Sequence, residues 1–315
     1  MARRKRLSPR KARTRPLRSR PSKVRVEDFS RIEAWGTGEG LEAILPQILK
    51  GKEIREIADE WSGAIGKKKA VILAMGAHPI KCGLSPLIID LMQRRALSAL
   101  ASTGALAIHD IEVALVGATS EEVEEELPSG LFGMARETGA FYNRAVRKGV
   151  EQGLGLGEAL GKAICEEKPP YLNESILARA YELGIPLTLH LAIGADVTHM
   201  HPGTEGALLG EASYRDFLLF AELLGGLDGG GLYINLGSAV QMPEVFLKAL
   251  NLSRNLKGKP HGFSALDMDM TPHYRPTQNV LSRPLLGGGR AYRLVGHHEI
   301  NFPLLYSMVL ERLSH

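Results

Sequence analysis

Several features that are common in proteins are scarce in this sequence. The 315 residues include two cysteines, Cys82 and Cys165, which provide neither a disulfide framework nor a zinc-binding signature. No apolar run reaches the roughly 18 residues that a membrane helix needs, and the basic N-terminus lacks the apolar core of a signal peptide. The sequence therefore predicts a cytoplasmic protein without a membrane segment.

Three familiar functional motifs are also absent. The sequence contains no P-loop, no GxSxG nucleophile elbow, and no GxGxxG motif after any expected strand. These absences argue against a kinase with a Walker motif and against a serine hydrolase. A nucleotide site, if the chain has one, would lack the commonest dinucleotide fingerprint.

The first 25 residues carry an unusual charge. They hold twelve lysines or arginines, three prolines and no acid, which leaves 39 − 12 = 27 basic and 35 acidic residues in the rest of the chain. A segment with so little to bury is expected to be disordered. It is either simply solvated or binds the phosphates of a nucleic acid, and its lack of interleaved aromatic residues argues against base stacking.

Beyond this tail, apolar runs that suit strands alternate with helical patterns. Residues 26–60 are expected to be mostly helical. The expected strands are residues 70–75, a run that ends at Thr103, and residues 185–191, 231–236, 263–268 and 292–295. This alternation is typical of a doubly wound parallel sheet. We therefore expect residues 26–315 to form one α/β domain with a Rossmann-like fold, preceded by a disordered tail over residues 1–25.

Glycine, aspartate and histidine are frequent directly after the expected strands. In open α/β sheets, ligands bind beyond the carboxyl ends of the strands, which meet at one edge. Glycines allow a ligand to approach the backbone, and helix N-termini after Gly76 and Gly237 would favour an anion such as a pyrophosphate. Aspartates suit ribose hydroxyls. The segments expected at this edge are residues 76–78, 103–110, 194–201, 235–238, 267–269 and 297–299.

Histidine can supply acid–base chemistry because it titrates near neutral pH. His109 and His199 are the candidates for a catalytic acid or base. An alternative is a divalent metal such as zinc, held by imidazole and carboxylate groups. Its ligands would come from His78, His109, Asp110, His199 and His201. By contrast, His190 lies within a strand and is expected in the core, and the acids of residues 121–126 are expected in a solvated helix start.

Five motifs, in this order, resemble those of the deoxyhypusine synthase family. They are AHPIKCGL at residues 77–84, TGAL at 103–106, IPL at 185–187, NLGS at 235–238 and FPLL at 302–305. The resemblance covers roughly residues 68–313 and implies a Rossmann-like fold that binds NAD. It also implies a homotetramer with sites at subunit interfaces. The matching cofactor-binding positions are Gly76, His78, Thr103, Gly104, Asp110, Asp196, Gly237, Ser238 and His297.

The chain departs from the family at the catalytic centre. The synthases are transferases that move an aminobutyl group through a reactive lysine in a Trp-Gly-Lys motif. The corresponding residues 280–285 (VLSRPL) contain no lysine, and arginine does not form a Schiff base. Hypusine formation itself is therefore not expected.

The sequence supports three hypotheses about function. In the first, the protein binds NAD or a related nucleotide and transfers a hydride to or from a small amine-type substrate. In the second, it is a metal-dependent enzyme that uses the same crevice. In the third, it is a non-catalytic binding protein whose basic tail recruits nucleic acid.

Overall fold

The structure is a computed structural model that describes residues 8–22, 24–25, 45 and 48–314. The strands are β1 (Val24–Arg25), β2 (Val71–Met75), β3 (Ala99–Thr103), β4 (Ala118–Thr119), β5 (Leu187–His190), β6 (Leu232–Leu236), β7 (Ser264–Asp269) and β8 (Ala291–Val295). The helices are α1 (Leu49–Gly66), α2 (His78–Lys81), α3 (Ser85–Gln93), α4 (Gly104–Val116), α5 (Val123–Glu126), α6 (Arg136–Glu151), α7 (Leu156–Glu167), α8 (Ile176–Leu183), α9 (Gly206–Leu223), α10 (Gln241–Lys257), α11 (Tyr274–Pro276) and α12 (His298–Leu313). The expected helix over residues 26–60 falls partly outside the described residues, and α1 covers its second half.

Six strands form one parallel sheet in the order β5-β3-β2-β6-β7-β8. The chain adds β3 and β5 on one side of β2, and then adds β6, β7 and β8 on the other side. Numbered along the chain, this order is 3-2-1-4-5-6, the order of the dinucleotide-binding Rossmann fold. The expected doubly wound, Rossmann-like sheet is therefore confirmed.

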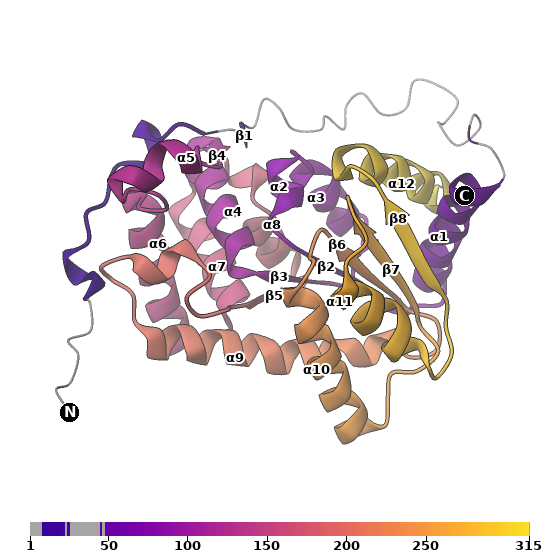
Figure 1. Cartoon of the computed structure of the whole chain (residues 1–315). Helices are drawn as coiled ribbons and strands as arrows, with labels where there is room; N and C mark the ends of the chain where they lie inside the picture. The colour runs from indigo at the N-terminus through magenta and orange to yellow at the C-terminus, as the bar shows by residue number, and fades with distance from the viewer. Residues whose placement is uncertain (1–7, 23, 26–44, 46–47, 315) are drawn as a thin grey trace.

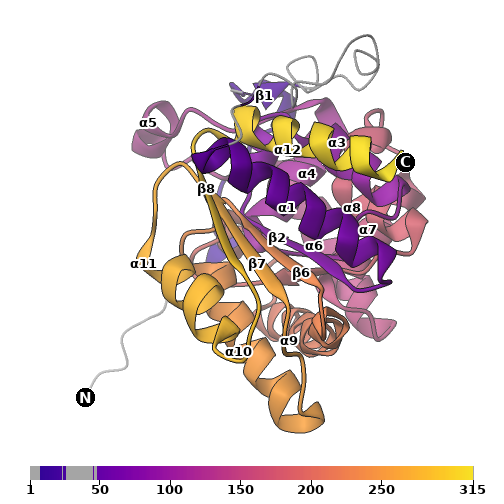
Figure 2. The ribbon, with the colours of Figure 1, turned by 90° about the vertical axis from the view of Figure 1, so that its right-hand side faces the viewer.

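Helices cover both faces of the sheet and create two apolar cores (Figures 1 and 2). Because side chains alternate along a strand, Val71 and Leu73 of β2 face one core and Ile72 and Ala74 face the other. Helices α1, α3, α4 and α12 pack in the first core, and α10 and the second half of α9 pack in the second. All five residues of β2 are buried, as parallel strands between two helix layers require.

The described part of the basic tail is bound to the body of the protein, which differs from the disorder expected for residues 1–25. We call residues 8–22 and 24–25 the N-terminal strap; in Figure 1 it lies beside α5 and α6. Leu17 is buried, and β1 pairs with β4. Arg15 pairs with Glu121 and Glu126, and Arg20 is also buried. The acids that pair with the strap lie more than ninety residues away in the sequence, so the composition of the tail gives no sign of these contacts.

In the part of the chain that the structure describes, no helix combines the length and the apolar character needed to cross a membrane.

Candidate functional site

The order in which the chain adds strands reverses between β2 and β6, and two of the predicted glycines meet there. A Cβ atom on Gly76 would collide with the carbonyl oxygen of Gly237, so the two backbones touch at the ends of neighbouring strands. Gly237 has a φ of +63°, a conformation that favours glycine. Ligands of open α/β sheets bind at such a switch point. We call the edge formed by Gly76, His78, Gly237, Ser238 and His298 the switch crevice.

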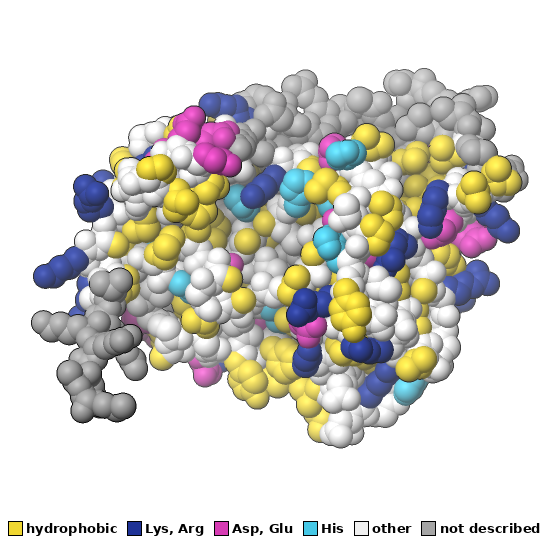
Figure 3. Space-filling model, viewed as in Figure 1, with side chains coloured by type: hydrophobic (Ala, Val, Ile, Leu, Met, Phe, Trp, Pro, Cys, Tyr) yellow, Lys and Arg dark blue, Asp and Glu magenta, His cyan; other side chains and the backbone are white. Residues whose placement is uncertain are grey.

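Histidines line one side of the switch crevice. The rings of His78 and His298 lie edge to face, with centroids 5.5 Å apart, and His298 also lies against Gly237. Burial lowers the pKa of His298. Figure 3 shows histidine side chains gathered on this face, near the ends of α2 and α12. The predicted His297 is instead the exposed N-cap residue of α12, whereas its neighbour His298 is buried against Gly237.

The expected helix N-termini next to these glycines are only partly present. Helix α2, after Gly76, has four residues and is too short for a useful dipole. Helix α10 begins four residues after Gly237, and the Ser238 hydroxyl accepts a hydrogen bond from the Met242 amide at 3.1 Å. The Ser238 hydroxyl therefore satisfies one amide in the first turn of α10, whose N-cap residue is Val240.

A cavity lies next to the ends of β3 and β5, and we call it the His109 pocket. It has a volume of about 210 Å³. Its wall includes the first turns of α4, the end of α2, the loop after β5 and the strap. The polar residues that line it are Arg20, Lys81, His109, Ser120, Glu121 and Asp196. Of the predicted residues, it therefore contains His109 and Asp196.

His109 faces this pocket as a neutral imidazole. Its Nδ1 lies 2.7 Å from the Thr119 hydroxyl oxygen. Burial, together with the positive charges of Lys81 and Arg20, lowers the pKa of His109 to about 3. A histidine with such a low pKa is an acceptor or donor of hydrogen bonds at pH 7, and it does not carry charge.

Asp196 lies against the N-terminus of α4. A Cβ atom on Gly104 would collide with Asp196 Oδ2, and the preceding Thr103 is the N-cap residue of the helix. Oδ2 is buried and has no hydrogen-bond partner among the described residues, and burial raises the pKa of Asp196 to about 6. A buried acceptor without a donor is costly, so a donor from a bound molecule would stabilise this site.

Asp110, predicted as a cofactor ligand, is instead an internal cap of α8. Its Oδ1 accepts the Ile176 amide at 2.7 Å, and its Oδ2 accepts the Ser175 hydroxyl at 2.5 Å and the Leu177 amide at 3.1 Å. The side chain is fully buried. Successive side chains of an α-helix point in different directions around its axis. Asp110 therefore points into the core, whereas its neighbour His109 points toward the edge of the sheet.

The other loop histidines are separated by the fold. His199 Nδ1 accepts the Gly194 amide at 3.1 Å, and its Nε2 is buried without a partner. His201 is buried against α6 and bonds to the Gly133 carbonyl at 2.7 Å. Among the described residues, no group of three or more His, Cys, Asp or Glu is placed to hold a metal ion. The metal hypothesis thus finds no support there. His190 is a buried core residue, as expected.

Sequence reasoning missed the polar residues that support the His109 pocket. Glu121, expected in a solvated helix start, is buried and accepts hydrogen bonds from Arg20 at 3.0 Å and from the Gly133 amide at 2.8 Å. Arg20 and Thr119 also belong to this set. The sequence offered one signal: beyond the basic tail, the rest of the chain contains more acidic than basic residues.

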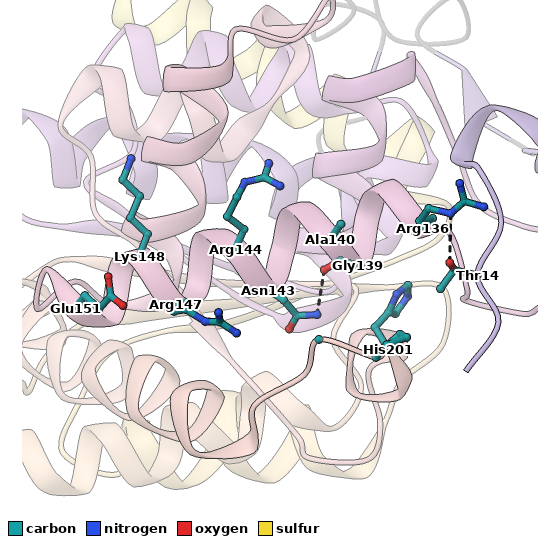
Figure 4. Close-up of a pocket in the computed structure, with 12 residues that line it drawn as sticks. Thr14, Arg136, Gly139, Ala140, Asn143, Arg144, Arg147, Lys148, Glu151 and His201 are labelled. Carbon is teal, nitrogen blue, oxygen red and sulfur yellow. Dashed lines mark hydrogen bonds between the residues drawn. The ribbon is translucent and has the colours of Figure 1, made fainter. Parts of the chain in front are cut away.

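A larger groove of about 510 Å³ runs along α6, but it contains none of the predicted catalytic or cofactor-binding residues. Figure 4 shows the basic side chains of α6 along it and His201 reaching toward the helix. Arg144, Arg147 and Lys148 are each paired with a glutamate: Glu167, Glu205 and Glu166. Exposed pairs of this kind leave little net charge for an anion.

Three crystal structures share this fold. ArgZ, an arginine dihydrolase from the ornithine–ammonia cycle in cyanobacteria, has a TM-score of 0.52 at 19% identity, covering 84% of this chain and 33% of its own. A conserved protein of the LOR/SDH type from Methanococcus maripaludis S2 has a TM-score of 0.52 at 18% identity, covering 89% of this chain and 72% of its own. AgrE, in a ternary complex with ornithine and NAD+, has a TM-score of 0.52 at 14% identity, covering 85% and 34%.

These similarities concern the fold, and the chain spans about a third of the length of ArgZ and AgrE. The matched structures also include a protein from Entamoeba histolytica assigned as a deoxyhypusine synthase, at 11% identity and a TM-score of 0.49. No protein-family model matches the sequence, and neither does any curated protein. The fold defines the class of this protein: an α/β protein with a Rossmann-like parallel sheet.

Proposed function

We propose that this protein binds a dinucleotide of the NAD class along the carboxyl edge of its sheet. The observation that carries the proposal is the strand order, in which the switch point falls where Gly76 and Gly237 touch. In this fold the pyrophosphate lies over the first strand and the adenosine half extends over the second. Here those strands are β2 and β3, so we assign the adenosine half to the His109 pocket.

The residues of the His109 pocket fit a ribose. An acidic side chain near the end of the second strand accepts the ribose hydroxyls in NAD-binding proteins of this fold. No acid directly follows β3, but the loop after β5 supplies Asp196 at the same place, next to Thr103 and Gly104. Its unpartnered oxygen is the acceptor that such a hydroxyl requires. The complex of AgrE with ornithine and NAD+ supports the same class of ligand for this fold.

The finer proposal is hydride transfer between the dinucleotide and a small amine-type substrate. When bound, the nicotinamide would supply the hydride chemistry, over the ends of β6 and β7. His78 follows β2 at the same edge and is the partly exposed imidazole that we assign to proton transfer, with the buried His298 packed edge to face against it. His109 serves the adenosine half in this arrangement, so its predicted catalytic role gives way to a binding role.

The proposal can be tested by filling the His109 pocket. Ala105, the second residue of α4, lines this pocket, whereas Ala207, the second residue of α9, is exposed to solvent. Calorimetric titration and thermal unfolding with millimolar NAD should show binding to the wild type and to Ala207→Trp, and no binding to Ala105→Trp. A ligand at 100 times its Kd adds about 2.7 kcal/mol to the unfolding free energy. Equal binding by both variants, or none by the wild type, would contradict the proposal.

A further inference from the structure

A chain of buried hydrogen bonds connects the N-terminal strap to His109. Arg20 donates to both carboxylate oxygens of Glu112, at 2.6 and 2.5 Å. Thr119 donates its hydroxyl proton to Glu112 Oε2 at 2.5 Å, and the same hydroxyl oxygen lies 2.7 Å from His109 Nδ1. Arg20, Glu112 and Thr119 are 8%, 1% and 0% exposed. The interaction between the strap and helix α4 thus continues directly to the wall of the His109 pocket.

The number of protons available in this series of hydrogen bonds determines which nitrogen of His109 is protonated. A guanidinium only donates, and a carboxylate paired with it only accepts. Thr119 has one hydroxyl proton, which goes to Glu112, so its oxygen can only accept from His109. Nδ1 therefore carries the proton of the imidazole. Since the ring is neutral, Nε2 carries a lone pair and no proton.

Nε2 is available to a ligand. His109 lines the pocket with 15% of its side chain exposed, and Nε2 makes no hydrogen bond in the described part of the chain. A lone pair favours a hydroxyl or an amino group and disfavours a phosphate oxygen, which brings only further acceptors. Asp196 and Glu121 line the same cavity and add to this preference. Two cations, Arg20 and Lys81, also line the cavity, but the charge of Arg20 is shared between Glu112 and Glu121, and the carboxylate of Asp196 offsets the single charge of Lys81.

We propose that the N-terminal strap, through Arg20, Glu112 and Thr119, orients His109 so that its Nε2 accepts a hydroxyl of the adenosine ribose. In this proposal Arg20, Glu112 and Thr119 are positioning residues, and His109 is the residue that touches the ligand. The pocket then selects an unphosphorylated ribose and rejects a 2′-phosphate. The ligand part of this inference rests on the proposed function, whereas the orientation of His109 does not.

The orientation of His109, seen as which of its ring nitrogens carries the proton, is tested on the full-length, ligand-free protein. Long-range proton–nitrogen NMR correlations of protein labelled with ¹⁵N-histidine report which ring nitrogen is protonated, and His109→Gln identifies the signals. We expect a protonated Nδ1 and an unprotonated Nε2 in the wild type. Thr119→Val keeps the shape but removes both hydrogen bonds and should move the proton toward Nε2, whereas Thr119→Ser should restore the wild-type pattern. A protonated Nε2 in the wild type, or no change in Thr119→Val, would overturn the inference.

The ligand preference is tested by titration with NAD and NADP. We expect the wild type to prefer NAD, and Thr119→Val to bind NAD about tenfold more weakly, as the loss of one oriented hydrogen bond predicts. NADP binding should change little, and Thr119→Ser should behave as the wild type does. Unchanged NAD affinity in Thr119→Val would overturn the ligand part.

The contribution of the strap itself is tested with Arg20→Ala. Without its guanidinium, the buried Glu112 is expected to take up a proton and donate it to Thr119, whose own proton then goes to Nδ1, so the imidazole proton should move to Nε2 as in Thr119→Val. If that variant does not fold because Glu112 is left unpaired, the Thr119 pair of variants still decides the question. If Nδ1 carries the proton as expected but no dinucleotide binds, the proposed function alone is contradicted. If a dinucleotide binds but Nε2 carries the proton, the inference about His109 alone is contradicted.

Discussion

The N-termini of α8 and α4 show two different uses of a buried aspartate. At α8, Asp110 accepts three hydrogen bonds, from Ser175, Ile176 and Leu177. At α4, Asp196 lies against Gly104 with one carboxylate oxygen buried and unpartnered. Burial raises the pKa of both groups to about 6. A carboxylate with all its donors stabilises the fold, whereas a buried carboxylate oxygen that lacks a donor costs stability.

The largest effect is expected for Asp110→Ala. Three buried donors would lose their acceptor, and the unfolding free energy should fall by about 3–5 kcal/mol. Denaturant unfolding measures this change. Asp59→Ala is the control: this aspartate is exposed and pairs with Arg312, so its loss should cost less than about 1 kcal/mol. A similar cost for both variants would show that the α8 cap contributes nothing special.

Asp196→Asn should separate binding from stability. The amide keeps the shape but weakens the acceptor, so NAD affinity should fall about 10- to 100-fold, as expected for hydrogen bonds to a charged group. The unfolding free energy should stay constant or rise, because no hydrogen bond to Oδ2 is lost. Titration calorimetry and denaturant unfolding of the same preparation give both values. If Asp196→Asn is as destabilised as Asp110→Ala, the contrast between the two helices is wrong.

Ser175→Ala should give a smaller loss at α8. The Ser175 hydroxyl accepts the Ala178 amide at 3.0 Å and donates to Asp110, so it is both the N-cap of the helix and a partner of the aspartate. N-cap replacements of this kind cost about 1–2 kcal/mol. NAD affinity should not change, and Ser175→Thr should recover part of the stability. A loss of NAD binding in Ser175→Ala would connect the two helices functionally.

The smallest effect is a dependence of binding on pH. Because Asp196 has a pKa of about 6 and accepts a hydroxyl best as a carboxylate, NAD affinity should rise up to about tenfold between pH 5 and pH 7. The raised pKa also means that the stability which Asp196 contributes in its neutral form is lost as pH rises through about 6. Asp196→Asn should lack both effects. A wild-type affinity that is flat over this range would show that Asp196 does not bind the ligand as a carboxylate.

The carboxyl edge of the sheet could be predicted from the sequence, whereas the direction of the side chains along it could not. Hydrophobic periodicity placed the strands within a few residues, and parallel strands bring their carboxyl ends to one edge wherever they lie in the chain. Gly76 and Gly237 therefore meet, and Asp196 lies beside Gly104. Which way each side chain points depends on helix phase and on distant neighbours. For this reason His298 replaces His297 in the crevice, and Asp110 faces the core.

The basic tail shows the limit of composition as evidence. Charge and proline content alone favour disorder. The ion pair of Arg20 with Glu112 joins residues 92 positions apart, and no local pattern announces such a contact. The strap is therefore a part of the pocket that only the folded chain reveals.

The sequence by itself determined the class of fold, because alternating strand and helix periodicities are local properties of the chain. It also determined that the reactive lysine of the resembling family is absent. Tertiary structure alone decided which polar groups received partners. Among the described residues, Asp110 has three donors, Asp196 Oδ2 has none, and Arg20 pairs with a buried carboxylate. The physical reason is that the cost or gain of burying a polar group depends on what lies opposite it, and in this protein the opposing residues come from distant parts of the chain.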